Sequence, residues 1–506
     1  MAVIGHDMKN FNLAVNTHVD PRRVEAVDVG AERQLLVDDF LLSLGGNHEQ
    51  YPRGIRWSVG PVEKHPAALF EGQAPWEESS AWLCVRREEG IYRMWYNSNQ
   101  KTRRGMYVSY AESDDGVEFV RRNQGQVELE GTTDNNVVFD GGLNGISPEF
   151  GTVFIDPHAL EGERYKMIYT DWNGPEVFDL PFTHNVGFLR GAASPDGIQW
   201  TRYYDNFLGR YCDSQNTVSW DETLGRYVAY HRTSAQYGGV EAGTYRVPAT
   251  GRGRAVGRLE SPDYRNWQST GVALQADFLD GLNSDIYNSA YSRYPGSPHL
   301  HFMFPSFYRH YEGTFEVQVC TSRDNRNWFR ACRDTFIPLG PEGAFDCFIV
   351  SVAPGFVEVD DDTLALYYRS GDGPHGGSRP IELPYTSVSR VGRVTFKRDR
   401  ILGIEADPGG GQFITRPLRF EGGRLLLNVE PLGKEAVLRA QLVSVEDGNP
   451  VPGHTFDDCL PITEDSIHAP VVWGGRERIA PDVAAKPAHL HIQYRDMRLY
   501  AFQFGA

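Results

Sequence analysis

Long apolar runs are missing from this sequence. No stretch reaches the roughly 18 apolar residues that a membrane-spanning helix needs. The opening stretch MAVIGHDMKNFNLAVN also lacks the apolar core of a signal peptide. We therefore expect a cytoplasmic protein that does not enter a membrane.

Basic clusters are scarce as well. The chain of 506 residues has 50 Lys and Arg against 67 Asp and Glu, which gives a net charge of −17. Binding to phosphate groups draws on clustered basic side chains. This balance argues against nucleic acids and acidic membranes as main partners.

Motifs for metal, cofactor or nucleophilic chemistry are also absent. There is no glycine-rich phosphate loop, no Gly-x-Ser-x-Gly sequence and no His-Glu-x-x-His sequence. Six cysteines lie far apart, without the paired spacing of a zinc site, at Cys84, Cys212, Cys320, Cys332, Cys347 and Cys459. We expect reduced cysteines, no metal and no cofactor.

Short apolar and aromatic runs recur along the chain. They are GIYRMWY, ERYKMIY, GRYVAY, HLHFMF and TLALYY, which end at Tyr96, Tyr169, Tyr230, Phe304 and Tyr368. Each follows another apolar run, and the first four precede a third. Such runs are typical of buried strands. The recurrence predicts five repeated β-sheet units.

A turn motif recurs with the same period. Ser, any residue, Asp, three residues and then Trp or Phe occur at Ser113/Asp115/Phe119, Ser194/Asp196/Trp200, Ser261/Asp263/Trp267 and Ser322/Asp324/Trp328. Ser and Asp side chains can cap the backbone amides of a tight turn, and Gly116 or Gly197 can take a positive φ. The aromatic ring can wedge between neighbouring sheets. We interpret the four turns as scaffold.

These patterns predict an all-β protein, a five-bladed β-propeller followed by a C-terminal β-sandwich. We expect residues 1–32 to form a tail, residues 33–390 the propeller and residues 391–506 the sandwich. The early segment RQLLVDDFLLS is expected to close the ring by joining the last blade.

In a propeller the innermost strands line a central channel, so residues that start these strands meet at one mouth. Acids stand there in every unit: Glu77, Glu78, Glu149, Asp213, Asp285, Glu342 and Asp346. One acid at a strand start is more often a turn cap, but gathered carboxylates can supply the acid and base of glycosidic cleavage. We expect Asp213 as nucleophile or base and Glu149 or Glu342 as general acid. Asp285 and Asp346 would stabilise the transition state or bind hydroxyls.

Polar and aromatic residues near the same mouth are expected to bind the substrate. Neutral sugars are held by hydrogen bonds and by stacking on aromatic faces. The candidates are Trp76, Asp171, Trp172, Gln215, His231, Arg232, Tyr308, Arg309, Arg369 and His375, and Asn97 and Asn99 end a second strand there.

The chain resembles the five-bladed propeller glycosidases, glycoside hydrolase families 32, 43 and 68, and most of all bacterial family-32-like proteins. The matching features are the LLVDDFLL strand, YRMWY, SPDGIQW, DSQNTVSWD, FIPLGPEGAFD and LYAFQF. The resemblance implies three catalytic carboxylates, whose nearest counterparts by position are Glu78, Glu149 and Asp213. The signature motifs around the catalytic acids of family 32 are missing here.

The leading hypothesis is a glycoside hydrolase or transglycosylase that cleaves a furanoside, a fructoside or an arabinofuranoside, in an oligosaccharide or glycoside. The alternative is a carbohydrate-binding propeller without catalysis, which the missing signatures favour. A lyase with His231 or Tyr308 as its base is a third hypothesis. Assembly into a homo-oligomer is left open.

Overall fold

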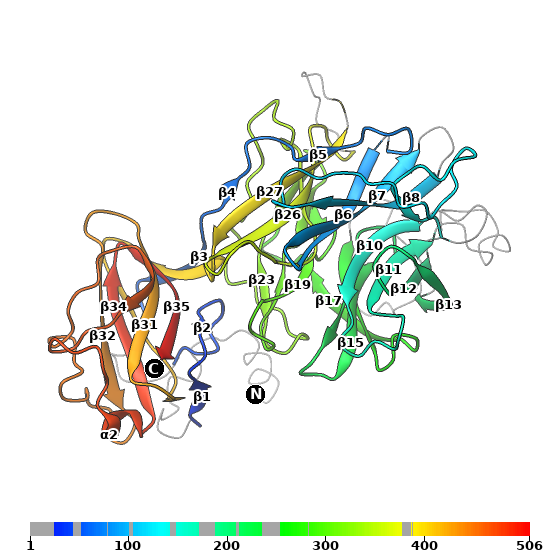
Figure 1. Cartoon of the computed structure of the whole chain (residues 1–506). Coiled ribbons are helices and arrows are strands. Elements are labelled where there is room, and N and C mark those ends of the chain that lie inside the picture. The colour runs from blue at the N-terminus through cyan, green and yellow to red at the C-terminus, as the bar shows by residue number, and fades with distance from the viewer. Residues whose placement is uncertain are drawn as a thin grey trace. The chain divides into compact units, whose positions relative to one another are not determined.

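The computed structural model describes residues 25–43, 52–77, 79–100, 105–141, 148–171, 188–208, 212–234, 253–281, 283–376, 386 and 388–505. These residues form strands and turns, with one short helix, α2 (Pro481–Ala484) (Figure 1). The prediction of an all-β protein is confirmed. No helix in the described part of the chain has the length and apolar character of a membrane span.

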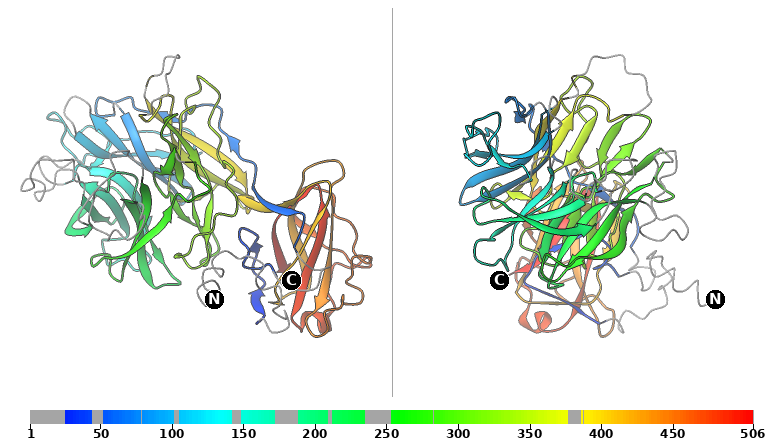
Figure 2. Two further views of the ribbon diagram at one scale, coloured as in Figure 1. Left: turned by 180° about the vertical axis from the view of Figure 1, so that it is seen from behind. Right: turned by 90° about the vertical axis from the view of Figure 1, so that its right-hand side faces the viewer.

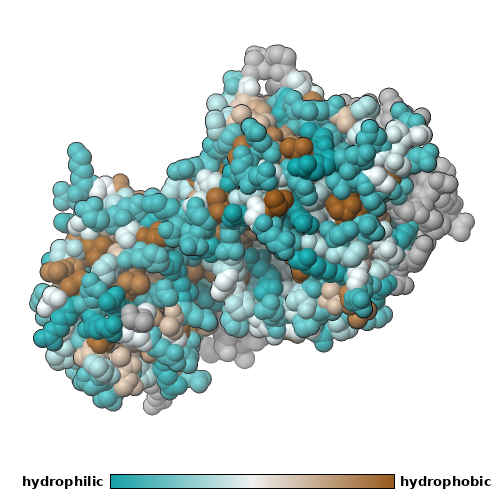
Figure 3. Space-filling view, viewed as in Figure 1, coloured by the Kyte–Doolittle hydropathy of each residue, from teal (hydrophilic) through white to brown (hydrophobic). Residues whose placement is uncertain are grey.

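The chain divides into two compact units, residues 62–396 and residues 1–61 with 397–506. The predicted boundaries differ from this division because residues 33–61 fall with the C-terminal residues. On the face drawn in Figure 3, hydrophobic residues form small separate clusters in a largely hydrophilic surface.

The unit of residues 62–396 contains three four-stranded antiparallel sheets. Within each sheet, neighbouring strands follow one another along the chain. The first contains β6 (Ser79–Glu88), β7 (Ile91–Gln100), β8 (Gly105–Ser113) and β9 (Val137–Phe139). The second contains β10 (Pro148–Ile155), β11 (Tyr165–Asp171), β12 (Phe188–Ser194) and β13 (Thr201–Leu208). The third contains β14 (Thr217–Asp221), β15 (Arg226–Ser234), β16 (Arg254–Ser261) and β17 (Gln268–Gln275). These strands match the predicted runs.

The rest of this unit is less regular. A nine-stranded sheet contains β18 (Ser284–Ile286), β21 (Ser306–Arg309), β22 (Thr314–Val317), β24 (Ile349–Val352), β25 (Val357–Glu358), β26 (Thr363–Gly371), β27 (Ser389–Lys397), β4 (Glu63–Lys64) and β5 (Phe70–Glu71). A three-stranded sheet contains β19 (Tyr291–Arg293), β20 (His301–Met303) and β23 (Cys320–Ser322). The expected fourth unit is therefore broken: Ala290, at φ 44°, separates β18 from β19, and Pro305, which has no N–H, separates β20 from β21.

The hairpin between β6 and β7 shows how local sequence sets the strands. Glu88 pairs with Ile91, so the loop is only Glu89 and Gly90, with φ of 53° and 86°. Positive φ at both loop residues is the type I′ geometry that matches the twist of antiparallel strands. This turn fixes the register that brings Trp82 and Asn97 to one end of the sheet.

Side chains connect the first strands of neighbouring sheets. The hydrogen bonds run from Gln215 Nε2 to Leu83 O and Gly151 O, from Cys84 Sγ to Val153 O and Pro354 O, from Ser214 Oγ to Tyr287 O and from Asn288 Nδ2 to Ser351 Oγ. The second view in Figure 2 shows the sheets following one another around a common centre. The backbone hydrogen bonds between strands do not join all these sheets into one continuous sheet.

The four Ser-x-Asp turns are confirmed as capping structures. In the second, Gly197 N donates to Ser194 Oγ at 2.8 Å, and the amides of Ile198 and Gln199 donate to Asp196 Oδ1 at 2.8 Å. Gly197 has a φ of 83°, and its carbonyl accepts from the indole of Trp95 in the preceding sheet at 2.7 Å. The turns thus bind one sheet to the next.

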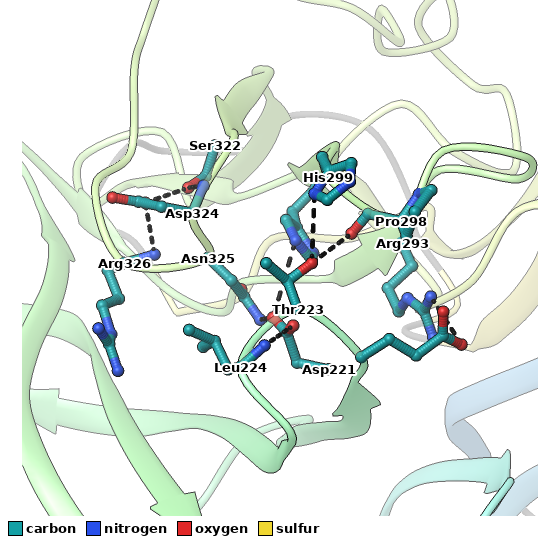
Figure 4. Close-up of polar contacts among 12 residues, drawn as sticks. Asp221, Thr223, Leu224, Arg293, Pro298, His299, Ser322, Asp324, Asn325 and Arg326 are labelled. Carbon is teal, nitrogen blue, oxygen red and sulfur yellow. Dashed lines mark hydrogen bonds and ion pairs between the residues drawn. The ribbon is translucent and has the colours of Figure 1, made fainter. Parts of the chain in front are cut away.

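The last of these turns, at Ser322 and Asp324, repeats the pattern (Figure 4). Asn325 has a φ of 54° at the position of Gly197. Its amide donates to Asp221 Oδ2 of the preceding sheet at 2.7 Å, and its carbonyl accepts from Tyr230.

The other unit has two sheets around one hydrophobic core. One contains β1 (Val27–Gly30), β29 (Gly411–Ile414), β30 (Leu418–Phe420), β32 (Val437–Ser444) and β34 (Ala488–Arg495). The other contains β2 (Gln34–Leu35), β3 (Ile55–Val59), β28 (Leu402–Ala406), β31 (Arg424–Pro431), β33 (Ser466–Pro470) and β35 (Met497–Gly505).

The segment RQLLVDDFLLS corrects one prediction. Its short strand β2 pairs with β35, and Leu36, Leu41 and Leu42 lie in the core of this unit. It does not join β27, which pairs with β4 and β5 instead. The apolar side chains of this segment pack in the core between the two sheets, and this packing fixes the position of the segment.

Candidate active site

A cavity of about 360 Å³ lies in the unit of residues 62–396, at the ends of several strands. Its lining residues are Trp82, Asn97, Asn99, Met106, Glu149, Asp213, Arg254, Tyr287, Arg369 and His375. They come from all three four-stranded sheets and from the nine-stranded sheet. Two of them, Glu149 and Asp213, are predicted catalytic acids, and Arg369 and His375 are predicted binding residues.

Glu149 is held by its neighbour from the first sheet. It is the second residue of β10, and the indole Nε1 of Trp82 on β6 donates to its Oε1 at 2.7 Å. A donor fixed in a packed ring orients the carboxylate.

Asp213 precedes β14 and is paired with arginines. Arg232 Nη1 lies 2.6 Å from its Oδ2, and Arg254 Nη2 lies 4.0 Å from its Oδ1. The side chain is 37% exposed, so the carboxylate remains open to the cavity. The next residue, Ser214, has a φ of 151°, a conformation that side-chain-bearing residues rarely adopt. Strain of this kind is often found at binding and catalytic sites.

Aromatic rings and guanidinium groups form one wall. Arg254 lies over the ring of Tyr287, 3.5 Å from its centroid, and Arg369 lies 4.9 Å from the ring centroid of Trp82. The ring centroids are 6.3 Å apart and the ring planes are tilted by 37°. Each ring of this wall thus has a guanidinium group over its face.

His375 presents an imidazole ring to the cavity. Burial, together with the nearby Arg369 and Arg254, lowers the pKa of His375 to about 4. Its ring packs edge-on against Tyr287, with the centroids 5.0 Å apart, and its carbonyl accepts from Tyr308. The ring is therefore neutral at neutral pH and has one nitrogen that can donate and one that can accept a hydrogen bond.

Other predicted acids lie away from the cavity lining. Asp171 is buried and bonds Arg190 at 2.9 Å. Asp285 is buried and contacts His310 at 3.1 Å. Each is held by a cationic or titratable partner instead of facing open space.

The remaining predicted acids also lie outside the cavity lining or outside the described residues. Asp346 is buried against Lys64 and accepts from Tyr368 at 2.9 Å, and Glu77 is buried against Arg121 at 2.8 Å. Glu342 is exposed in a turn. Glu78 lies outside the described residues. The prediction that an acid from every unit meets at one mouth is therefore not fulfilled in the described residues.

Several predicted binding residues serve the scaffold. The Gln215 amide bonds two backbone carbonyls, and the Trp76 indole donates to Asn136 Oδ1 at 2.9 Å. His231 is buried, and its Nδ1 lies 2.7 Å from Arg232 O.

Four further predicted binding residues contact the site indirectly, lie elsewhere or are undescribed. Arg309 pairs with Glu316 at 3.0 Å, away from the lining. Arg232 and Tyr308 hold the lining residues Asp213 and His375. Trp172 lies outside the described residues.

The residues predicted from the sequence do not include Trp82, Met106, Arg254 or Tyr287. Trp82 lies within β6 and not at its start, and Tyr287 directly follows β18. Its place beside a predicted strand start was the available signal for Tyr287. Arg254 and Met106 lie at the start of the third strands of their sheets, whereas the predicted residues lie at first and second strands.

Across the residues that the structure describes, no group of three or more His, Cys, Asp or Glu side chains is placed to hold a metal ion.

Comparisons with known proteins find similar solved structures only. No protein-family model matches the chain. No curated protein matches it. One similar structure, titled "Glycoside hydrolase", has 14% identity and a TM-score of 0.46, over 67% of this chain and 92% of the other.

Two others carry titles of the same kind. One concerns the GH130 family of mannoside phosphorylases, with 15% identity and a TM-score of 0.41, over 68% of this chain and 96% of the other. The other is the catalytic domain of a GH62 α-L-arabinofuranosidase from Coprinopsis cinerea, with 12% identity and a TM-score of 0.41, over 69% and 98%. Similarities of this size do not establish a shared activity.

Proposed function

We propose that the protein is a glycoside hydrolase and that the cavity around Glu149 and Asp213 is its active site. The observation that carries the proposal is that these two carboxylates, from different sheets, line one cavity together with Trp82 and Tyr287. Two carboxylates across a glycosidic bond are what hydrolysis needs.

The proposed roles follow from the contacts of each acid. Asp213, paired with Arg232 and partly open to solvent, acts as nucleophile or base. Glu149, beside the indole donor of Trp82, acts as general acid. The amide of Asn99 and the ring of Tyr287 are suited to a sugar, which offers hydroxyls and an apolar face.

In this proposal the sheets of residues 62–396 form the five blades of a propeller. The side-chain hydrogen bonds between successive first strands support it. The two sheets around one core support a β-sandwich in the other unit. The cleaved bond is a furanoside, as the resemblance to the propeller glycosidases implies.

The test is incubation with fructans, arabinans and synthetic furanosides and analysis of the released sugars. Glu149→Gln and Asp213→Asn should each reduce kcat by at least about 100-fold, while the exposed Glu118→Gln and Asp114→Asn should not change it. Full activity of both cavity variants would refute the assignment.

A carbohydrate-binding protein without catalysis is the second candidate. The close ion pair of Asp213 with Arg232 favours it, because a paired carboxylate is a weaker base. Sugar binding without any released product would support this alternative.

A further inference from the structure

Arg369 belongs to β26, and its guanidinium group faces the cavity over the ring of Trp82. Its Nε donates to Ser389 Oγ at 3.2 Å. This neutral contact orients the side chain and engages Nε alone.

No carboxylate of the described residues lies within ion-pair distance of Arg369. The other arginines at the cavity differ: Arg232 bonds Asp213 at 2.6 Å, and Arg254 lies 4.0 Å from the same carboxylate. A partly buried guanidinium group normally acquires a charged partner. Burial lowers the pKa of Arg369, although Tyr287 and Glu149 oppose this shift. Arginine nevertheless stays charged in proteins.

The lining carries two carboxylates, Glu149 and Asp213, and two guanidinium groups, Arg254 and Arg369, but these charges are not paired evenly. Asp213 contacts both Arg232 and Arg254, and Glu149 accepts the indole hydrogen bond. His375 is neutral, since the pKa of its ring is about 4. A carboxylate beside Arg369 would give this guanidinium group the close charged partner that it lacks among the described residues.

We propose that the substrate is an acidic glycan and that Arg369 binds the carboxylate of one of its uronate units. This inference rests on the proposed function, because it names the substrate class of the same cavity. The planar guanidinium group matches a carboxylate in a bidentate manner. Inorganic phosphate is disfavoured because it carries more negative charge than a carboxylate and would approach Glu149 and Asp213.

Binding measured by calorimetry tests the inference independently of cleavage. The probes are oligogalacturonides and their carboxyl-reduced counterparts, which carry a neutral hydroxymethyl group in place of each carboxylate. We expect the acidic probes to bind at least about 10-fold more tightly to the wild type. Arg369→Gln should remove this preference by lowering the affinity for acidic probes about 10- to 100-fold, and Arg369→Lys should retain part of it.

Arg326→Gln is the matched control, because this arginine forms its ion pair with Glu260 away from the lining residues. Equal affinity for acidic and reduced probes, or an equal effect of Arg369→Gln on both, would overturn the inference. Competition by phosphate at lower concentration than the uronates would overturn it in favour of a phosphate site.

Cleavage is followed separately on the same probes and on the furanoside panel. Binding of acidic probes without cleavage of any probe or furanoside would refute the proposed hydrolysis and leave the anion site standing. Cleavage of neutral furanosides, without any preference for acidic over neutral substrates, would support the proposed hydrolysis and refute the anion site. An unsaturated product with ultraviolet absorbance would indicate elimination and refute hydrolysis.

Discussion

The indole of Trp82 donates a hydrogen bond from one sheet to the carboxylate of Glu149 in the next, with 2.7 Å between Nε1 and Oε1. The same ring lies beneath the guanidinium group of Arg369. One side chain therefore touches both the proposed acid and the proposed anion site.

Replacing Trp82 by Phe should lower kcat/KM about 10- to 100-fold, because it keeps an aromatic ring but removes the hydrogen bond that orients Glu149. Steady-state kinetics on the best glycoside of the panel measures this. Trp200→Phe is the control, since that indole donates only to the carbonyl of Gly197 in a turn. Equal losses in both variants would show that the Glu149 contact is not used in catalysis.

Glu77→Gln should reduce the free energy of unfolding by about 3 kcal/mol and leave kcat unchanged. Glu77 is buried against Arg121, Tyr96 and Asn136, and removal of its charge leaves the guanidinium group unbalanced. Chemical unfolding measures the loss. Glu222→Gln, from an exposed pair with Arg293, should cost less than about 0.5 kcal/mol. A loss of activity with unchanged stability would instead return Glu77 to the active site.

Asp196→Ala should reduce the free energy of unfolding by about 1–2 kcal/mol, because two backbone amides of the turn lose their acceptor. Thermal unfolding of this variant beside Gln199→Ala provides the measurement. The Gln199 side chain is exposed and only its backbone amide enters the turn. Identical melting of the two variants would contradict the capping role.

Acid should destabilise the protein through its buried histidines. Burial lowers the pKa of His231 to about 4, whereas the unfolded chain has a value near 6.5. Between these values the unfolded state binds more protons. The free energy of unfolding therefore falls as pH falls from about 6.5 to about 4, by at most about 3 kcal/mol for this group.

Chemical unfolding of the wild type and His231→Asn at several pH values checks this. The variant should show a smaller slope in that window, with the remaining slope due to His301, His375 and His491, whose pKa values are also about 4. Identical slopes would mean that His231 is already protonated in the folded state.

The periodic parts of the fold were predictable from the sequence. Regular alternation and the Ser-x-Asp turns are local signals, and the strands from β6 to β17 follow them. The fourth unit was not predictable in this way, because the breaks at Ala290 and Pro305 interrupt otherwise continuous apolar runs. The segment near Leu36 reads as a strand, but its partner was decided by a core formed from residues far away in the chain.

Part of the candidate site was predictable from the position of acids at strand starts. Glu149 and Asp213 stand at strand starts and reach the cavity. Asp285 and Asp346 stand at equivalent points, but His310 and Lys64 hold them in buried contacts. A partner supplied by another strand cannot be read from the position of an acid within its own repeat.

The joints between first strands have a structural consequence. Gln215, Cys84, Ser214 and Asn288 link neighbouring sheets through single side chains, so one substitution loosens or reshapes one joint without disturbing the pairing inside either sheet. Substitutions at these joints can therefore change the arrangement of neighbouring sheets one joint at a time while each sheet keeps its own strand pairing.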